Sequence, residues 1–281
     1  MKKFSQLATP YIVWSILMLL LPMLLIAVYS VVNTGNSIVS FTLTLDHFRK
    51  FFTDPDFLLI LWRSIVIAVK TTVICILLGY PTAYFISKCK EKIGNILILA
   101  ITLPTWINML VRTYAWIGIL SSGGIVYTIL KFLGFGDVEL LYTEGAVLLG
   151  MVYNFIPFMI LQINTSLSKM DKSLLEASAD LGANKFLTFW KVTFPLSLPG
   201  VISGISLVFL PAVSSFFIPK LLGGGQYFLI GNMIENQFIT VGEWNFGSAI
   251  SMIMAMIMML SMYAVRKIEE RNTGKRKEKR K

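Results

Sequence analysis

The chain has 281 residues, of which 56% are hydrophobic and only 14% are charged, and its mean hydropathy is +0.72. A soluble domain carries roughly 25% charged residues, and one core of this size cannot bury so much apolar surface. Composition therefore excludes an ordinary soluble protein. The net charge of +10 does not indicate nucleic acid, because the Lys and Arg residues gather at the ends of apolar runs and in the C-terminal tail.

In chain order, six apolar segments reach the length of about 20 residues that a membrane-spanning helix needs. They are expected at 11–32, 62–87, 96–120, 144–167, 199–219 and 246–265. The first is too long for the apolar part of a signal peptide, and no small-residue cleavage site follows it, so we expect it to be retained. The sequence thus predicts an all-α integral membrane protein with six transmembrane helices.

Three regions are expected along the chain: an N-terminal helix with an outer loop at 1–60, a transmembrane core at 61–265 and a basic tail at 266–281. Six crossings place both termini on one side. If that side is the cytoplasm, 18 of the 25 Lys and Arg residues lie inside, four lie outside, and three lie in or near spans. The positive-inside rule therefore predicts cytoplasmic termini. Eight of the 15 acidic residues lie outside, which either attracts a cationic substrate or only reflects the scarcity of Lys and Arg there.

Two charges deserve separate interpretation because a charge near the bilayer centre costs about 2.5–3.5 kcal/mol. Arg112 is expected either to reach the interface or to face other helices, whereas Lys70 lies deeper. No Asp or Glu lies in the interior of a span, which argues against a proton-coupled carrier. His47, Cys75 and Cys89 lack the spacing of metal ligands, so neither a metal site nor a catalytic constellation is expected.

The connection at 168–198 is itself patterned. Ser173 and Glu176 match a capping box that begins a short helix, and Gly182 is a natural stop for it. Asn184 is expected to cap a second helix. Two prolines are expected to end that helix before the fifth span: Pro195 and Pro199. The pattern predicts a helix–turn–helix on the cytoplasmic face.

The two helices of this connection have different surfaces. Phe186, Phe189 and Trp190 fall on one side of the second helix and suit a hairpin that only anchors the loop at the membrane. The first helix suits that alternative poorly, because its exposed face is small and acidic: Glu176, Ala179 and Asp180. A small surface permits the close approach of another protein.

The spacing Glu176-Ala177-Ser178, three residues to Gly182, and nine more to Val192-Thr193-Phe194-Pro195 resembles the EAA loop of binding-protein-dependent ABC permeases. The sequence departs from that motif modestly, at Ser178, Val192 and Phe194. The resemblance implies a permease of the type I ABC importer fold, whose loop docks onto a separate ATPase subunit. The residues that it assigns to docking are Glu176, Ala177, Ser178, Asp180, Gly182, Ala183 and Pro195. Since the chain lacks a G-x-x-x-x-G-K-[ST] phosphate loop, ATP is expected on the partner and no enzymatic activity or cofactor on this chain.

Further stretches resemble the spermidine/putrescine permease subunits, and most of all the first of the two membrane subunits. They are Gly79–Tyr84, Pro104–Trp116, Leu221–Gly224 and Leu229–Asn232. Permeases for iron, thiamine and opines share parts of them, so these substrates remain open. The chain departs at Lys220, where relatives often have an acidic residue.

The resemblance implies a bacterial inner-membrane location and a set of partners. These are two ATP-binding subunits, one homologous permease subunit, an extracytoplasmic solute-binding receptor and membrane lipid. Polyamines are best bound by carboxylates and aromatic faces. The candidate pathway residues are Trp106, Asn108, Tyr114, Trp116, Glu235 and Trp244. The aromatic residues also suit an interfacial belt, and a secondary transporter or an exchange of roles between the two permease subunits remains an alternative.

Overall fold

The structure, a computed structural model, describes residues 2–34, 41–134, 139–171 and 173–278. The helices are α1 (Lys2–Val31), α2 (Asp46–Thr53), α3 (Pro55–Lys88), α4 (Glu91–Thr102), α5 (Met109–Leu120), α6 (Ile125–Phe132), α7 (Glu144–Ser168), α8 (Ser173–Asp180), α9 (Lys185–Thr188), α10 (Phe194–Ser214), α11 (Phe217–Leu222), α12 (Ile230–Glu235) and α13 (Trp244–Glu278). Strands β1 (Val32–Thr34) and β2 (Phe41–Leu43) form one antiparallel pair. A 3₁₀ turn covers Leu103–Trp106, and π-turns cover Phe189–Thr193 and Asn236–Val241.

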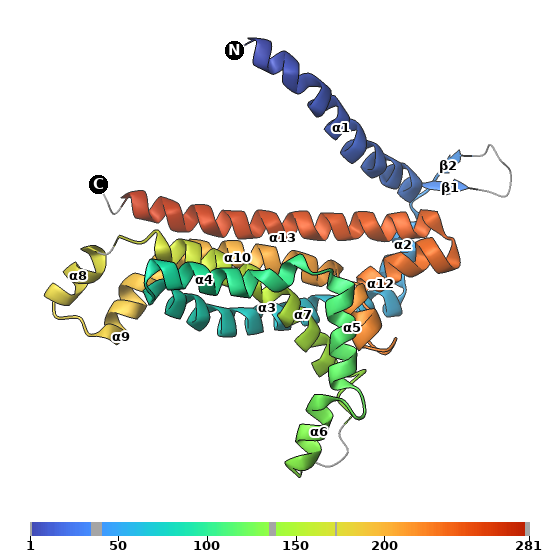
Figure 1. Cartoon of the computed structure of the whole chain (residues 1–281). Coiled ribbons are helices and arrows are strands. Elements are labelled where there is room, and N and C mark those ends of the chain that lie inside the picture. The colour runs from blue at the N-terminus through green and yellow to red at the C-terminus, as the bar shows by residue number, and fades with distance from the viewer. Residues whose placement is uncertain (1, 35–40, 135–138, 172, 279–281) are drawn as a thin grey trace.

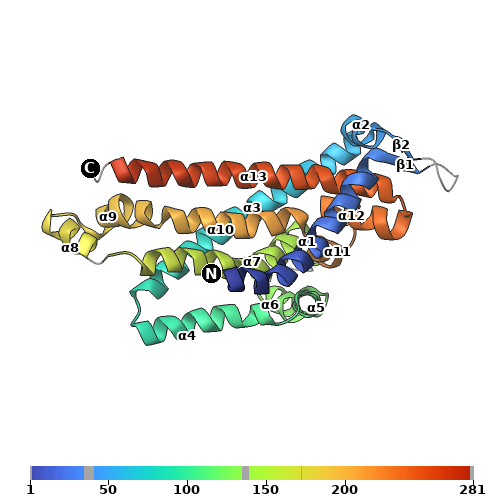
Figure 2. The same ribbon diagram turned by 90° about the horizontal axis from the view of Figure 1, so that it is seen from above.

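The centre of the molecule is a bundle in which α7 packs against both α3 and α10. In both views α4, α7, α10 and α13 run alongside one another, and the α8–α9 pair projects from one end of the bundle (Figures 1 and 2). Helices α5 and α6 turn away from the bundle axis, while α1 leans away from the bundle and contacts α13 (Figure 1). The C-terminal end of α13 lies at the same end as α8 and α9.

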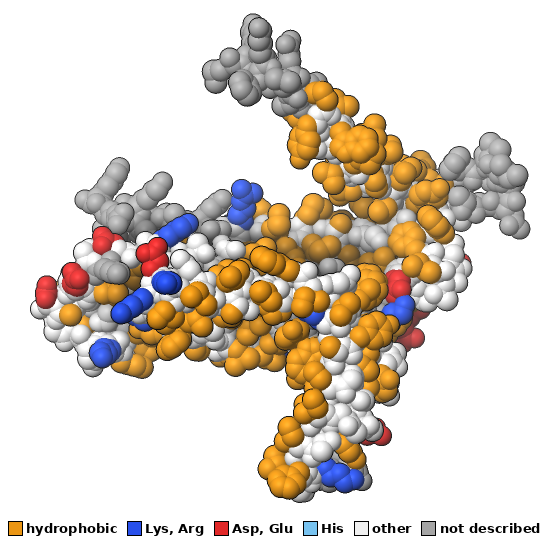
Figure 3. Space-filling view, in the orientation of Figure 1, with side chains coloured by type: hydrophobic (Ala, Val, Ile, Leu, Met, Phe, Trp, Pro, Cys, Tyr) orange, Lys and Arg blue, Asp and Glu red, His pale blue; other side chains and the backbone are white. Residues whose placement is uncertain are grey.

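Among the residues that the structure describes, six stretches are long and apolar enough to cross a membrane, which is the predicted number. They are Pro10–Val31, Pro55–Lys88, Met109–Phe132, Glu144–Ser168, Lys185–Ser214 and Trp244–Lys267. Figure 3 shows hydrophobic side chains along the visible side of the bundle, whereas charged side chains gather at the end that carries α8 and α9. This distribution suits a body within lipid and an end in water.

The third expected span is wrong as a single helix over 96–120. Helix α4 ends at Thr102, and α5 begins only at Met109 after the 3₁₀ turn and an extended Ile107. Pro104 lacks the N–H that a continuing α-helix would need. The Asn108 side chain then accepts the Leu110 N–H at 2.8 Å and starts a new helix. The stretch after the break that is long and apolar enough for a span is Met109–Phe132, which comprises α5, a short irregular connection and α6.

The prediction that two prolines end the second hairpin helix is also wrong. Helix α9 continues through the π-turn at 189–193 directly into α10. Pro195 lies in the first turn of α10, and Pro199 lies inside that helix. The wider π-turn shifts backbone pairing from i−4 towards i−5, so the missing proline N–H and the proline ring are accommodated without a break.

Small residues allow α7 and α10 to approach closely. A Cβ atom on Gly200 would lie 2.6 Å from the Gln162 carbonyl oxygen, and one on Gly204 would lie 2.5 Å from the Met159 sulfur. Close backbone approach is the usual basis of helix association in lipid, where hydrophobicity gives little force between helices. The position of the bundle helices therefore depends on these glycines.

Candidate functional site

Helices α8 and α9, with their connection, form a hairpin (residues 173–188) at one end of the bundle (Figure 1). The Ser178 and Thr188 hydroxyl oxygens lie 3.0 Å apart and join its two arms. Helix α8 also packs against the π-turn that follows α9. The predicted helix–turn–helix is confirmed in form.

The start of α8 differs from the predicted capping box. Ser173 is the first helical residue rather than the cap, and its N–H donates to the Asp171 carboxylate at 3.0 Å. The acceptor for the first N–H of α8 is therefore Asp171, and Ser173 lies in the helix rather than before it. The pKa of Asp171 is lowered because the backbone N–H and then the hydroxyl of Ser173 donate to its ionised form.

The end of α8 is the one predicted. Gly182 has φ +78°, a left-handed conformation that favours glycine. Its N–H donates to the Ala179 carbonyl at 2.8 Å, and the Ala183 N–H donates to the Ser178 carbonyl at 3.1 Å, which together form a Schellman motif. No atom lies within 4 Å of a Cβ built on Gly182, so this position faces open space.

The start of α9 also agrees with the sequence. Asn184 accepts the Leu187 N–H at 2.8 Å and is the predicted cap. The turn between the two helices is thus defined by two local hydrogen-bonding motifs.

The hairpin exposes some of the predicted docking residues and turns others inward. Glu176, Ala177, Asp180 and Gly182 are exposed on α8 and at the turn. Half-buried positions are Ser178, Ala183 and Pro195, the last in α10 rather than in the hairpin. The tip is therefore formed by the four exposed residues, and Pro195 is separate from it.

Leu181 is an exposed apolar residue that the sequence reasoning missed. Its side chain is 89% exposed beside the exposed Asp180 and Gly182. The signal was its place directly before the glycine stop, where the α8 pattern ends and no neighbouring turn covers a side chain. A single exposed apolar side chain is common on protein surfaces, so Leu181 does not by itself mark an interface.

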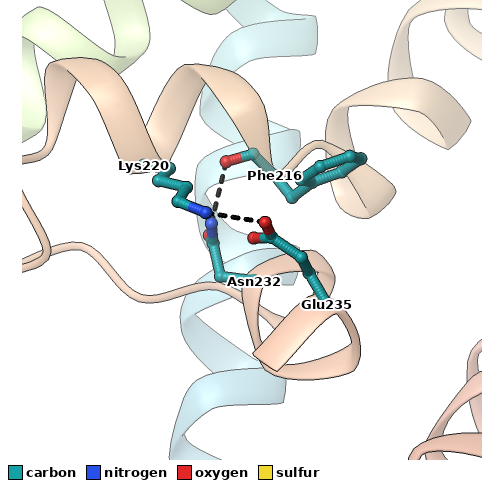
Figure 4. Close-up of polar contacts among 4 residues, drawn as sticks. All are labelled: Phe216, Lys220, Asn232 and Glu235. Atoms are coloured by element: carbon teal, nitrogen blue, oxygen red, sulfur yellow. Dashed lines mark hydrogen bonds and ion pairs between the residues drawn. The ribbon is translucent and has the colours of Figure 1, made fainter. Parts of the chain in front are cut away.

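The candidate pathway residue Glu235 is paired within the chain (Figure 4). Its carboxylate lies 2.6 Å from the Lys220 ammonium, and the Glu235 side chain is 19% exposed against 55% for Lys220. Asn232 donates to the Phe216 carbonyl at 2.8 Å in the same region and so joins α12 to the irregular backbone between α10 and α11. The charge of Glu235 is therefore balanced by Lys220 within the chain.

The candidate residues of the third span divide between exposed and packed positions. Trp106 is 75% exposed and Tyr114 is 59% exposed. Trp116 packs edge-on against Tyr153 of α7 with ring centroids 5.4 Å apart, and the Arg112 guanidinium lies 5.9 Å from the same ring. Trp116 and Arg112 therefore attach α5 to α7.

The other candidates have local contacts. The Asn108 side chain caps α5, and Trp244 meets Phe238 edge-on at 5.7 Å where α13 begins. Within the residues that the structure describes, no ring contact or ion pair joins the third-span aromatic residues to Glu235 or Trp244. Their assignment to one pathway stays a prediction.

Lys70 also has an acidic partner. Its ammonium is paired with the carboxylate of Glu144, the first residue of α7. Both groups line a hollow of about 360 Å³ together with Trp62, Arg63 and Tyr227. The sequence reasoning singled out Lys70 without identifying Glu144, because the two residues are 74 positions apart.

Comparison with known proteins agrees with this architecture. The family of binding-protein-dependent transport system inner membrane components matches residues 2–275. The spermidine/putrescine transport system permease protein PotB of Haemophilus influenzae is 37% identical over 265 residues, which cover 93% of this chain and 92% of that protein.

Two solved structures share the fold. One is of a bacterial ABC transporter involved in the import of the acidic polysaccharide alginate, with TM-score 0.76 and 17% identity over 95% of both chains. The other is of a bacterial alginate ABC transporter in complex with an alginate pentasaccharide-bound periplasmic protein, with TM-score 0.75 and 16% identity over 95% of this chain and 94% of that one. At these identities the likeness shows the fold alone.

Proposed function

Since the chain belongs to the family of binding-protein-dependent transport system inner membrane components, we propose that it is a permease subunit of an ATP-driven importer of polyamines, spermidine and putrescine. The observation that carries the substrate is the 37% identity to the spermidine/putrescine permease PotB along nearly the whole of both chains. Permeases for iron, thiamine or opines remain the alternatives, because the identity is moderate.

The hairpin is the part of the chain that would contact the ATP-binding subunits and move with them. Its tip combines carboxylates, small residues and the exposed Leu181, and it projects from the bundle where a partner can reach it (Figure 1). ATP would be bound and hydrolysed by two partner subunits, and this chain would perform no chemistry. Movement of the hairpins on ATP binding would open the pathway outward, and hydrolysis would reset it.

The remaining partners follow from the same role. A homologous permease subunit would complete the pathway, and a solute-binding receptor would dock at the end of the bundle opposite the hairpin. Helix α1 has an apolar stretch at Pro10–Val31 that the rest of the chain leaves exposed, so lipid or the second permease subunit would cover it. Both termini would lie in the cytoplasm with the hairpin, in agreement with the distribution of Lys and Arg.

The substrate would meet an acidic group that is already neutralised. Polyamine ammonium groups bind carboxylates and aromatic faces. Glu235 offers such a carboxylate, with Lys220 as its resident counter-ion. In this scheme an ammonium group of the polyamine and the Lys220 ammonium compete for the Glu235 carboxylate.

The test is the uptake of labelled spermidine by cells that lack this gene and are complemented with wild type, Gly182→Trp or Gly134→Trp. Gly134 is a matched control, because it also has positive φ (+85°) and open space around its Cβ position but lies outside the hairpin. Wild type and Gly134→Trp should restore uptake, and Gly182→Trp should be inserted in the membrane but inactive. No uptake by wild type with every partner present would refute the polyamine assignment. Equal loss in both glycine variants would refute a specific docking role for the hairpin turn.

A further inference from the structure

Hollows separate the hairpin from the ends of the neighbouring bundle helices. Two hollows of about 360 and 440 Å³ share four lining residues, which are Tyr84 and Lys88 of α3, Leu175 of α8 and Thr193 of the π-turn. Dispersion attraction falls by about a quarter to a half across a gap of about 0.5–1 Å, so groups on opposite walls of a hollow attract one another only weakly. Besides the continuous backbone from α9 into α10, displacement of the hairpin therefore passes where side chains touch.

Phe189 makes such a contact. Its ring lies edge-on to Tyr80 with centroids 5.8 Å apart and to Tyr84 with centroids 5.5 Å apart. The two tyrosines are separated by four residues, so they share one face of α3. Phe186 lies in the hairpin three residues before Phe189, is 73% exposed, and has its ring 6.3 Å from that of Trp190.

Tyr80 extends the contact into α10. Its hydroxyl lies 2.7 Å from the Ser197 hydroxyl, which donates to the Phe194 carbonyl at 2.9 Å. The Tyr80 ring also lies 5.6 Å from the Phe194 ring. The π-turn that follows the hairpin, α3 and α10 are thus joined through one set of touching side chains.

The backbone at Phe189 is suited to bending. Phe189 is the first residue of the π-turn at 189–193, which connects α9 to α10. Single π-turns within α-helices often mark functional positions, and their irregular pairing makes a local change of angle easier than in a regular helix. The backbone of the π-turn bends easily, whereas the Phe189 ring is in contact with α3. Displacement of the hairpin is therefore passed to α3 through the ring.

We propose that Phe189 is a positioning residue that transmits displacement of the hairpin to α3 through Tyr80 and Tyr84, with the π-turn as the flexible link to α10. The inference rests on the proposed function, because it requires an ATP-binding subunit that moves the hairpin. It adds the residues through which that movement reaches the transmembrane helices.

The test uses the complete importer, with its ATP-binding subunits, second permease subunit and receptor, in proteoliposomes. Two quantities are measured for each variant: labelled spermidine transported and ATP hydrolysed. Phe189→Ala should retain its ATP-binding subunits and hydrolyse ATP, while the spermidine moved per ATP falls by about tenfold, within the range of coupling between distant sites. Phe189→Tyr, which keeps the ring, should restore the ratio, and the matched control Phe186→Ala should leave it unchanged.

A second variant covers the case in which Phe189→Ala fails to assemble. Tyr84→Leu removes the nearer of the two α3 rings that Phe189 contacts and should lower the same ratio. A normal ratio in Phe189→Ala or in Tyr84→Leu would overturn the proposal, as would a fall in transport and hydrolysis by the same factor. A wild-type chain that recruits no ATP-binding subunit would instead refute the proposed function, so the two failures are distinguishable.

Discussion

Replacing Ser197 by alanine should destabilise the protein more than replacing Tyr80 by phenylalanine, although both changes remove the same hydrogen bond. Ser197 donates its single hydroxyl hydrogen to the Phe194 carbonyl at 2.9 Å. Tyr80 must therefore be the donor in the 2.7 Å contact between the two hydroxyls. The Tyr80 residue is 8% exposed and Ser197 is fully buried, so water does not replace a lost partner.

The magnitudes follow from which group is left without a partner. In Tyr80→Phe, Ser197 keeps its bond to Phe194, and the loss is that of one ordinary hydrogen bond, about 0.5–1.5 kcal/mol. In Ser197→Ala, the buried Tyr80 hydroxyl has no acceptor, and leaving such a group unsatisfied costs about 1–3 kcal/mol. The double variant removes both groups, so its stability should lie near that of Tyr80→Phe rather than at the sum of the two losses.

The assay is reversible unfolding of the purified protein in lipid–detergent bicelles, followed by tryptophan fluorescence for wild type, the two single variants and the double variant. We expect the free energy of unfolding to be lower in Ser197→Ala than in Tyr80→Phe by about 1 kcal/mol, which is about fivefold in the equilibrium constant. Equal losses in the two single variants, or strict additivity in the double variant, would refute the assignment of donor and acceptor.

Three further changes test other parts of the structure. Gly200→Ala should lower the thermal midpoint of unfolding by separating α7 from α10, at a cost of about 1–3 kcal/mol, whereas Gly118→Ala, with nothing within 4 Å, should not. Lys220→Met should lower the thermal midpoint more than Glu235→Gln, because it leaves the less exposed partner of the ion pair unpaired; an equal effect would contradict this order. Asn108→Ala should cost about 0.5–2 kcal/mol through the lost cap of α5, measurable by the same unfolding assay, and no change would show that the break after Thr102 does not need the cap.

The features that could be predicted from the sequence depend on neighbours along the chain. Six apolar stretches were recognised because span length and composition are local properties. Gly182 and Asn184 were assigned correctly because the hydrogen bonds of a helix end join residues at most five positions apart. The same reasoning misplaced the cap at the start of α8, because the helix begins at Ser173 itself and the Ser173 N–H donates to the Asp171 carboxylate.

The form of the backbone at the prolines could not be predicted from the sequence and is seen only in the structure. Both Pro104 and Pro195 lack an N–H, yet the first lies in a break and the second in a continuous helix. The difference is a side-chain cap after Pro104 and a π-turn before Pro195. A proline shows where regular pairing must change, but not which of these two solutions the chain adopts.

The partners of charged and polar groups could likewise be identified only from the tertiary structure. Glu235 lies 15 positions from Lys220, and Tyr80 lies 117 positions from Ser197. In a soluble helix, the apolar stripe shows which face is buried. In a membrane helix, both the lipid-facing side and the packed side are apolar, so hydrophobicity does not show how each helix is rotated. The sequence alone determined the number of apolar spans and the turn of the hairpin at Gly182 and Asn184. The packing of α3, α7 and α10 decided which side chains meet, because close contacts between helices depend on their rotation and on the glycines that let them approach.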